Sequence, residues 1–445
     1  MTLVAEIQPF RGIRYNPARL GRDLSAVISP PYDVISPEEQ AALYERHPRN
    51  MVRLELTRGE PGSSAGLRYQ RAAVDYRQWQ AEGTLIQEER PALYLYRQEF
   101  AVDGAVYQRR GLIVLLRLEP WERRVVRPHE RTLSAPKRDR LELMRATRAN
   151  FSPIWVLYRD PRAVGLELWE RMQGRPADIA ARDQGGVRHE VWVEDDPYPL
   201  RALREALMGQ PVYIADGHHR YETALLLRSE NFAGASPCPD EAAINFTLAY
   251  LVESADPGLL VLPTHRVVQC EAALDRDAVM SSLGRWFDLH EHPGGPYAVV
   301  SALGQADPAP AFGIWAPGIG LSAVAQLRDP AGVPEALAPG RSDDWRLLDL
   351  AALHTLGIDQ LCPEGTTALS EAGRLMYART IDEVERTLAS GQWDIGFLVR
   401  RTSVEQVMAV ADACDLMPEK STYFYPKPAT GLVIASLEGE VLPAR

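Results

Sequence analysis

The strongest signal in the chain is one continuous stretch, Val212-Tyr213-Ile214-Ala215-Asp216-Gly217-His218-His219-Arg220-Tyr221. Its first four residues are apolar and predict a short buried strand, which the Asp-Gly pair ends. The residues that follow, up to Arg228, have the spacing of a helix. A strand that turns directly into a helix is typical of proteins that mix the two elements. We therefore expect an α/β fold, with α+β as the alternative.

The sequence on both sides of this stretch continues the mixed pattern. Apolar runs predict strands at residues 92–96, 111–116, 154–158 and 246–252. The first two are joined through Asp103-Gly104, which predicts a hairpin. Residues 67–79 have helical spacing, and Ser36-Pro37-Glu38-Glu39 has the cap, proline and glutamate of a helix start. Strands and helices also alternate in the last third of the chain.

Length and turn-rich segments suggest how the chain divides. With about 150 residues per domain, 445 residues correspond to about three domains. The best linker candidates are Pro293-Gly294-Gly295-Pro296 and the Pro/Ala-rich run at 306–310. We expect an N-terminal α/β region, a central region and a C-terminal α/β region, at residues 1–115, 116–292 and 293–445.

The composition is that of an ordinary globular protein. Hydrophobic residues make up 46% and charged residues 24%, which excludes disordered, collagen-like and coiled-coil classes. No apolar run approaches the ~18 residues of a membrane span, and the N-terminus lacks a signal-peptide pattern. The four cysteines have neither the density of a disulfide framework nor metal-clip spacing. We expect a cytoplasmic protein without membrane association, and the net charge of -11 argues against a nucleic-acid partner.

The turn after the strand has the groups of a phosphate site. A strand that ends at Asp216 and opens a helix leaves free backbone N–H groups and the positive end of the helix dipole at the turn. Gly217 allows an anion to approach the backbone, and His218, His219 and Arg220 add charge-assisted donors. A helix cap with surface histidines is one alternative. A zinc site is a weaker one, because adjacent histidines point to different sides of a helix.

A second candidate is the segment Arg127-Pro128-His129-Glu130-Arg131-Thr132. Arginines on both sides favour the ionised form of the Glu130 carboxylate, which can accept a proton from an attacking hydroxyl. The segment belongs to a basic stretch, residues 121–148, with nine Lys and Arg against four acids. A solvated salt-bridge cluster is the alternative.

The chain has three lysines, Lys137, Lys420 and Lys427, among its 49 basic residues. A compact ammonium and a planar guanidinium are not equivalent at a phosphate, so these lysines are candidates for positions where arginine does not serve, and chance survival is the alternative. Lys420 and Ser421 resemble a phosphate loop without its glycines, and a turn bonded to its own backbone explains them equally well.

Several phrases together resemble a bacterial and archaeal family known as a domain of unknown function, the one numbered one thousand and fifteen. They are Pro31-Tyr32-Asp33-Val34-Ile35-Ser36, His129-Glu130-Arg131-Thr132 with Lys137, Asn150-Phe151-Ser152-Pro153, the Ala215-to-Tyr221 stretch and the closing segment 417–427. Because they are spread over nearly the whole chain, the resemblance covers its full length.

A more distant resemblance implies an activity. Pro-His-Glu followed by Asp-Gly-His-His-Arg is similar to the pattern of free-serine kinases in the ParB/sulfiredoxin-like superfamily. The resemblance implies a ParB/sulfiredoxin-like catalytic core with additional α/β regions. It also implies Glu130 as the base for the serine hydroxyl, and a phosphate and metal-side group of Asp216, His218, His219 and Arg220.

We therefore expect a phosphotransferase that moves a phosphate from ATP or ADP to a small hydroxylated metabolite, with free L-serine the best candidate and Mg²⁺ as cofactor. The expected catalytic residues are Glu130, His218 and Asp216, with Asp216 also on the metal. Phosphate or nucleotide contacts are expected from Gly217, His219, Arg220, Arg131, Lys137, Lys420, Ser421 and Lys427. Substrate-side contacts are expected from Tyr32, Asp33 and His129. The alternatives are a phosphatase and a non-enzymatic, ParB-like, nucleotide-responsive binding protein.

Overall fold

The structure is a computed structural model that describes residues 5–441 apart from residues 60–64, 133, 173, 233–238 and 272. The chain folds into two compact units. The first unit contains Met1–Pro128, Thr132–Leu260 and Pro426–Arg445, and the second contains His129–Arg131 and Val261–Tyr425. Each unit is built on a sheet of its own.

This division differs from the three regions that the sequence suggested, 1–115, 116–292 and 293–445. Strands of the first two regions pair in one sheet, so no boundary separates those regions. The linker candidates lie inside the second unit, where Gly295 precedes helix α10 (Pro296–Leu303) and residues 306–310 precede strand β16 (Ala311–Ala316). Proline and glycine mark a turn and a linker in the same way, so turn chemistry did not distinguish them.

A nine-stranded mixed sheet forms the centre of the first unit. Its strands, in spatial order, are β6 (Val126–Arg127), β11 (Val212–Asp216), β8 (Ile154–Tyr158), β12 (Phe246–Glu253), β5 (Ala105–Arg117), β4 (Leu93–Val102), β10 (Arg188–Glu194) and β9 (Ile179–Arg182), with β1 (Ile7–Gln8) paired to β5. β11 is parallel to β6 and β12 to β8, whereas the other pairings are antiparallel. The mixed sheet with helices packed on it confirms the expected combination of α and β elements.

Strands β4 and β5 form the expected hairpin. Asp103 and Gly104 connect Val102 to Ala105, and both have positive φ angles of 51° and 78°. Two consecutive residues with positive φ are characteristic of the type I′ turn, whose twist matches that of the flanking strands. The Asp-Gly pair therefore sets the register of the two longest strands.

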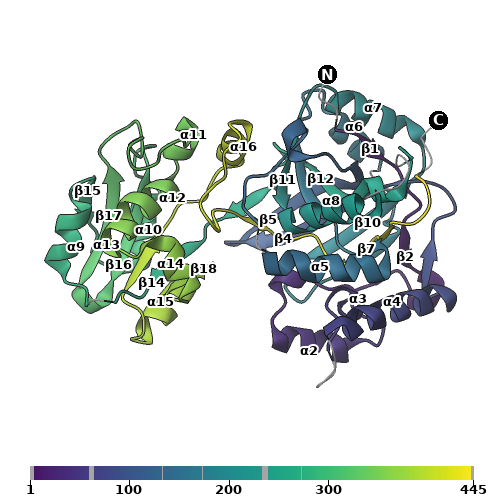
Figure 1. Ribbon diagram of the computed structural model, residues 1–445, viewed down its shortest axis with the longest axis horizontal. Coiled ribbons are helices and arrows are strands. Elements are labelled where there is room, and N and C mark those ends of the chain that lie inside the picture. Colours follow the sequence, from purple (N-terminus) through teal and green to yellow (C-terminus); the bar gives the residue numbers. More distant parts are fainter. Residues whose placement is uncertain are drawn as a thin grey trace. The chain divides into compact units, whose positions relative to one another are not determined.

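The second half of the basic stretch at residues 121–148 forms helix α5 (Ser134–Thr147) of the first unit. Helix α5 packs between α4 and α8, and Figure 1 shows α5 running alongside α8. Ser36 caps α2 in a capping box with Glu39, as expected. The helices are α1 (Pro17–Leu20), η1 (Tyr32–Val34), α2 (Pro37–Arg46), α3 (Val52–Glu55), α4 (Ala65–Ala81), η2 (Trp121–Arg123), α5 (Ser134–Thr147), α6 (Val164–Arg171), α7 (Pro197–Leu207), α8 (His218–Phe232) and η3 (Ala243–Asn245). Two short sheets pair β2 (Ile13–Tyr15) with β3 (Leu85–Gln87), and β7 (Ala149–Asn150) with β21 (Ala435–Ser436).

The core of the first unit holds α8 against the sheet. Tyr221, Ala224 and Leu227 recur every three residues and so share one face of the helix. They are buried in one cluster with Val156 of β8 and Ile214 of β11. This packing fixes the first turn of α8 relative to the end of β11.

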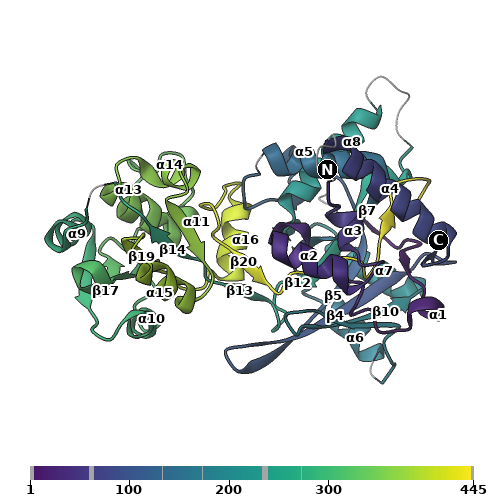
Figure 2. The same ribbon diagram turned by 90° about the horizontal axis from the view of Figure 1, so that it is seen from below.

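The second unit is built on a six-stranded antiparallel sheet (Figure 2). Its strands, in spatial order, are β15 (Phe287–Glu291), β17 (Leu321–Leu327), β16 (Ala311–Ala316), β19 (Ile395–Leu398), β14 (His265–Val268) and β18 (Leu375–Ala378), and β13 (Leu260–Leu262) pairs separately with β20 (Tyr423–Tyr425). Its helices are α9 (Arg276–Leu283), α10 (Pro296–Leu303), η4 (Pro317–Ile319), α11 (Asp343–Arg346), α12 (Asp349–Ala352), η5 (Leu353–Ile358), α13 (Asp359–Leu361), α14 (Gly365–Glu371), α15 (Ile381–Ala389) and α16 (Val404–Asp412). Val299 and Leu303 of α10 pack with Val324 and Leu398 of the sheet in its core.

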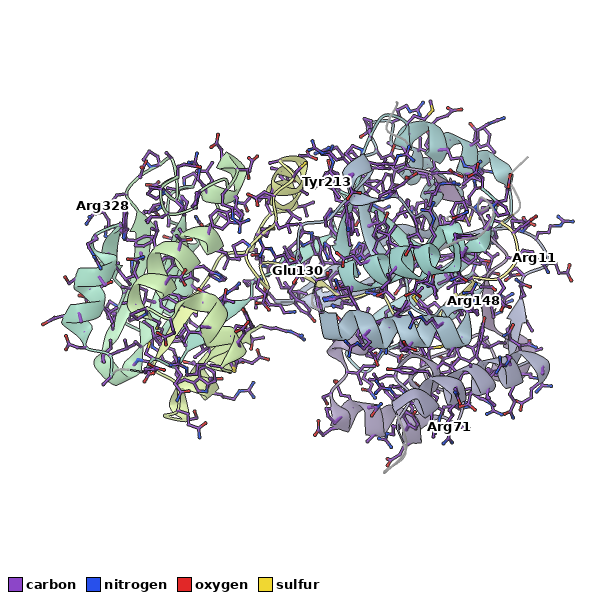
Figure 3. All side chains as sticks on the ribbon, in the orientation of Figure 1. Arg11, Arg71, Glu130, Arg148, Tyr213 and Arg328 are labelled. Atoms are coloured by element: carbon purple, nitrogen blue, oxygen red, sulfur yellow. The ribbon has the colours of Figure 1, made fainter. Side chains whose placement is uncertain are left out.

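Charged side chains cover the outside of both units. Arg11 and Arg71 of the first unit and Arg328 of the second are exposed, and Figure 3 shows each at the edge of its unit.

Among the described helices, none combines the length and the apolar character that crossing a membrane requires.

Candidate functional site

The turn between β11 and α8 has the predicted strand–glycine–helix form. β11 ends at Asp216, Gly217 has a φ of +95°, and α8 begins at His218. A Cβ on Gly217 would lie 3.1 Å from Ile154 Cγ2 and 3.1 Å from the Arg220 guanidinium. The positive φ favours glycine, and the close neighbours leave a side chain little room. The turn therefore depends on glycine for both its conformation and its packing.

Asp216 lies in a cluster of four charged side chains, which we name the Asp216 cluster: Asp33, Asp216, Arg220 and Lys427. Asp216 Oδ2 accepts a hydrogen bond from Arg220 Nη2 at 2.6 Å, and Asp216 Oδ1 is 2.7 Å from Lys427 Nζ. Lys427 also forms an ion pair with Asp33 Oδ2. The structure thus brings together four of the sequence-predicted residues, from η1, β11, α8 and the segment that begins at Pro426.

The lysine of this cluster is a permanent cation at neutral pH. The Lys427 side chain is 12% exposed. Burial disfavours its ammonium form, but the Asp216 and Asp33 carboxylates outweigh burial and raise the pKa of Lys427 above its ordinary value. Two carboxylates around one ammonium leave the group of Lys427, Asp33 and Asp216 with one net negative charge, which Arg220 balances.

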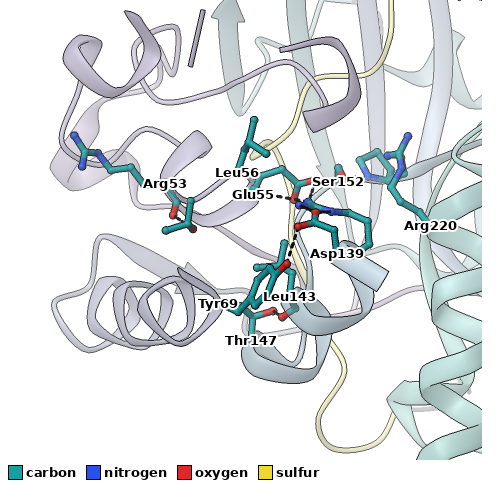
Figure 4. Close-up of polar contacts among 12 residues, drawn as sticks. Arg53, Glu55, Leu56, Tyr69, Asp139, Leu143, Thr147, Ser152 and Arg220 are labelled. Atoms are coloured by element: carbon teal, nitrogen blue, oxygen red, sulfur yellow. Dashed lines mark hydrogen bonds and ion pairs between the residues drawn. The ribbon is translucent and has the colours of Figure 1, made fainter. Parts of the chain in front are cut away.

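A second layer of buried charge lies behind the cluster. Glu55 at the end of α3 is 3% exposed and Arg140 of α5 is 4% exposed; their closest charged atoms are 3.4 Å apart. Ser152 donates to Glu55 Oε1 at 2.9 Å, and Asp139 accepts from Arg140 Nε at 2.8 Å and from Tyr69 at 2.7 Å. Figure 4 shows this layer, with Arg220 on the side of α8.

Tyr32 links the two layers. Its ring lies 4.1 Å from the guanidinium carbon of Arg140, a cation–π contact. Burial raises the pKa of Tyr32 to about 12, although Arg220 and Arg140 act in the opposite direction. The hydroxyl is therefore protonated at neutral pH and is available as a hydrogen-bond donor.

The segment Asn150-Phe151-Ser152-Pro153 holds this region together through its backbone and side chains. The Pro153 carbonyl accepts a hydrogen bond from Arg220 Nη1, and Asn150 Oδ1 accepts one from the Leu248 backbone N–H at 3.1 Å. A cavity of about 30 Å³ lies between Glu55, Arg140, Ser152 and Arg220. That volume suits one water molecule, so a nucleotide would have to bind outside this cavity.

Lys137 lies in a wider groove between α5 and α8. Its Nζ is 2.8 Å from Glu222 Oε2, which also accepts a hydrogen bond from Thr132. The groove has a volume of about 610 Å³ and is lined by Trp121, Lys137, Arg138, Leu141, Glu142, Arg145, Glu222, Leu225 and Leu226. Pockets of about 300–1,000 Å³ are typical of small-molecule sites, and this one combines apolar walls with three cationic and two acidic side chains.

His218 and His219 occupy the first turn of α8. His218 is 3% exposed and His219 is partly exposed. The surface-histidine interpretation therefore does not apply to His218. In the described part of the chain, no group of three His, Cys, Asp or Glu side chains is placed to hold a metal ion. The two histidines therefore have no further ligands with which to form a zinc site among these residues.

The predicted base belongs to the second unit. His129, Glu130 and Arg131 form a short part of it, and Figure 3 labels Glu130. His129 is 1% exposed, and its Nε2 is 3.0 Å from Thr422 Oγ1. Because Asp216 belongs to the first unit, the pairing of Glu130 with the Asp216 cluster stays a prediction.

Lys420 and Ser421 also belong to the second unit, in a turn bonded to its own backbone. The Ser421 hydroxyl donates to the Pro418 carbonyl at 2.5 Å. Lys420 has a φ of 53°, and its carbonyl accepts a hydrogen bond from Arg266 Nη2 at 3.1 Å. This is the geometry of the self-bonded turn that the sequence left open as the alternative to a phosphate loop.

Sequence reasoning missed Glu55 and Arg140. Arg140 stood out only as one cation of the basic stretch, because sequence alone does not show which face of α5 is buried. Glu55 has no signal in the sequence, since its partners, Arg140 and Ser152, are far away in the chain. The resemblance did single out Ser152, which is the residue that orients Glu55.

Comparison with known proteins identifies a family but no established activity. A family model described as "Protein of unknown function (DUF1015)" matches residues 7–332. No curated protein matches the chain.

Three solved structures show distant similarity. A conserved hypothetical protein from Pyrococcus furiosus has a TM-score of 0.36 and 14% identity over 73% of this chain and 95% of that chain. A free serine kinase in complex with AMP has a TM-score of 0.36 and 13% identity over 70% and 86%. SbnI with a C-terminal truncation, from Staphylococcus aureus, has a TM-score of 0.32 and 10% identity over 74% and 87%. At these TM-scores the similarities assign no activity to this chain.

Proposed function

Because the chain belongs to the DUF1015 family, whose function is unknown, we propose its activity from its own residues: it is a phosphotransferase that moves a nucleotide phosphate to a small hydroxylated metabolite, with free L-serine the best candidate. The observation that carries the proposal is the Asp216 cluster at the glycine turn. The choice of L-serine as the acceptor comes from the motif resemblance to free-serine kinases, which have a ParB/sulfiredoxin-like core.

The turn suits a phosphate group in transfer. The first backbone N–H groups of a helix lack partners within the helix, and at α8 they follow Gly217, where the Arg220 guanidinium lies beside the turn. Arg220 is held rigidly by Asp216 and by the Pro153 carbonyl. A fixed guanidinium stabilises developing charge without having to reorganise. His218 and His219 would add donors in the same helical turn.

Lys427 would supply the second cation at this site. Its raised pKa keeps the ammonium charged, and its two carboxylate partners hold it in position. Asp33 and Asp216 would supply carboxylates to Mg²⁺ only in place of their ion pairs with Lys427, since this ion usually takes one or two carboxylates together with substrate phosphates. The metal would neutralise charge on the phosphates.

The groove between α5 and α8 supports nucleotide binding. Trp121, Leu141 and Leu225 provide an apolar wall for a base, and the cations Lys137, Arg138 and Arg145 exceed the lining acids Glu142 and Glu222 by one positive charge, which favours phosphates. A nucleotide is amphipathic in the same way. Glu130 would accept the proton of the acceptor hydroxyl, as the resemblance implies, because general bases in phosphoryl transfer act in this role.

A phosphoryl-transfer assay tests the proposal. The full-length protein would be incubated with Mg²⁺, ATP or ADP, and serine or a panel of small alcohols, with phosphorylated product followed by ³¹P NMR. We expect O-phosphoserine from the wild type and a loss of about 100-fold or more in kcat for Glu130→Gln and for Asp216→Asn. Asp240→Asn is the matched control, because Asp240 is 84% exposed and pairs with Arg117 at the surface.

The other outcomes separate the alternatives. Nucleotide or phosphate-ester cleavage that does not respond to any alcohol would replace the kinase with a phosphatase. Nucleotide binding without turnover would favour the nucleotide-responsive binding protein. Thermal melts of each variant distinguish lost chemistry from lost folding, since Asp216→Asn also removes two ion pairs.

A further inference from the structure

Two cysteines of the second unit lie against each other. Cys270 follows β14, Cys362 follows α13, and their Sγ atoms are 3.0 Å apart. Cys362 is 3% exposed and Cys270 is half-buried. A disulfide needs an S–S distance of about 2.05 Å, so a shift of about 1 Å between the two sulfurs would allow a bond. This pair cannot be recognised from the sequence, because 91 residues separate the two cysteines.

The surroundings polarise the pair. The Cys270 backbone N–H donates to Asp394 Oδ2 at 2.8 Å, which places a carboxylate beside Cys270. Arg374 lies on the side of Cys362, with Nη2 2.9 Å from Glu364, and Arg374 Nη1 has no hydrogen-bond partner among the described residues. The hydrogen bond between the two sulfurs and the charge of Arg374 lower the pKa of Cys362, against burial and the Glu364 carboxylate, and the same hydrogen bond together with burial raises the pKa of Cys270. These surroundings favour ionisation of Cys362 over ionisation of Cys270.

The pair connects two elements that are already joined by a buried hydrogen bond. Arg266 of β14 donates to His354 of η5, which leads into α13, at 3.2 Å between Nε and Nε2. The cysteines join the ends of the same two segments. A covalent bond at this point would require no new arrangement of the unit. A metal site does not explain the pair, since the described residues offer no third His, Cys, Asp or Glu ligand in a suitable place.

We propose that Cys270 and Cys362 form a reversible redox site that a peroxide converts to an intramolecular disulfide. The Cys362 thiolate attacks one peroxide oxygen, so an S–O bond forms, the O–O bond breaks, and hydroxide leaves and is protonated to water. The Cys270 sulfur then attacks the Cys362 sulfur, the S–S bond forms, and the sulfenic oxygen leaves as water with the Cys270 proton. Two thiols lose two electrons, and the peroxide gains them.

Peptide mapping of the intact, full-length protein tests this site. Fully reduced protein would be treated with hydrogen peroxide, blocked with N-ethylmaleimide and digested without reductant. We expect a cross-linked peptide that contains Cys270 and Cys362 and that dithiothreitol separates. The oxidised protein should also have a higher Tm than the reduced protein, because a cross-link restricts the unfolded chain.

Variants make the test specific. The Cys238→Ser/Cys414→Ser double variant should form the same cross-link, since Cys414 is exposed and lies elsewhere, and Cys238 is outside the described residues. Adding Cys270→Ser should abolish the cross-link and leave Cys362 as a sulfenic acid that dimedone traps. The proposal is overturned if both thiols stay free after peroxide treatment, or if Cys270 and Cys362 cross-link to Cys414 or Cys238 instead of to each other. A Tm increase that persists in the Cys270→Ser variant would also contradict it.

Discussion

Lys427 in the first unit and Arg266 in the second each lie near a candidate segment, and the two cations have opposite surroundings. In the Asp216 cluster, Lys427 contacts two carboxylates. In the second unit, Arg266 is fully buried and donates to the carbonyls of Thr264, Glu419 and Lys420 and to His354. The carboxylates raise the pKa of Lys427, whereas burial lowers the pKa of Arg266 to about 10. We refer to Arg266, His354, Glu419 and Lys420 as the Arg266 cluster.

The difference shows what a buried cation does in each unit. Arg266 meets mainly neutral acceptors, so it satisfies the backbone of the turn that contains Lys420 and has a structural role. Lys427 contacts the Asp33 and Asp216 carboxylates next to the N-terminus of α8. An anionic ligand bound there would interact directly with these charged groups. Lys420 and Lys427 are seven residues apart and look equivalent in the sequence, yet only Lys427 has a charged setting that supports phosphate chemistry.

The largest expected effect distinguishes these two lysines. Lys427→Met leaves Asp33 and Asp216 without their shared cation, and we expect it to lower the free energy of unfolding by about 2–4 kcal/mol, somewhat less than for a fully buried pair because Asp33 is 37% exposed. Lys420→Met should change it by less than about 0.5 kcal/mol. Urea unfolding at pH 7 measures both. Equal losses would remove the distinction between the two lysines.

The pH dependence of the Lys427 effect checks its electrostatic origin. A raised pKa in the folded state means that the stabilisation is fully present below the ordinary lysine pKa of about 10.4 and is lost as pH rises through the higher folded value. The difference between wild type and Lys427→Met should therefore be constant between pH 7 and about 10 and decrease above that range. A difference that does not depend on alkaline pH would indicate lost packing.

Acid should affect the second unit through its neutral histidines. Burial and the nearby Arg266 lower the pKa of His265 to about 4, and its Nδ1 accepts a hydrogen bond from the Val399 backbone N–H at 3.2 Å. The unfolded chain takes up a proton below about pH 6.5 and the folded chain does not, so stability falls with pH, by about 2 kcal/mol at pH 5. His265→Gln should lose less stability between pH 7 and pH 5, measured by urea unfolding. His290→Gln, at an exposed position, is the control; an identical acid response in all three proteins would contradict the prediction.

Gly217→Ala should lower the free energy of unfolding by a smaller amount, through the turn between β11 and α8. The positive φ and the contacts at 3.1 Å predict a loss of about 1–2 kcal/mol. A Cβ would also press on the Arg220 guanidinium, which is proposed to bind the phosphate, so KM for the nucleotide should rise. Gly104→Ala is the matched control, because Gly104 has a φ of +78° with nothing within 4 Å of its Cβ position. A stability loss in both variants with a KM change in neither would remove the turn from the site.

Lys137→Met should have the smallest effect on folding. Lys137 and Glu222 are 32% and 27% exposed, and a partly exposed ion pair contributes about 0–1 kcal/mol. If the α5–α8 groove holds nucleotide phosphates, the variant should raise the Kd of ATP or ADP while Tm changes little, as isothermal titration calorimetry would show. Unchanged nucleotide affinity would place the nucleotide outside this groove.

Local sequence patterns predicted the elements around the site because their signals are local. The apolar run 212–215, the Asp-Gly turn and the helix from His218 all occur as expected. So do the capping box at Ser36 and the Asp103-Gly104 hairpin turn. Each depends on the conformational preferences of a few adjacent residues, which a single sequence displays.

The sequence by itself determined the mixed α/β class, the Asp216–Gly217–His218 transition and the small set of charged residues from which a site could be built. Tertiary structure decided which of these meet. It placed Lys427 between Asp33 and Asp216, paired Glu55 with Arg140, and assigned Glu130 and Lys420 to the other unit. The physical reason is that the strength and direction of a charge's effect depend on burial and on partners far away in the chain, and neither is encoded in the spacing of neighbouring residues.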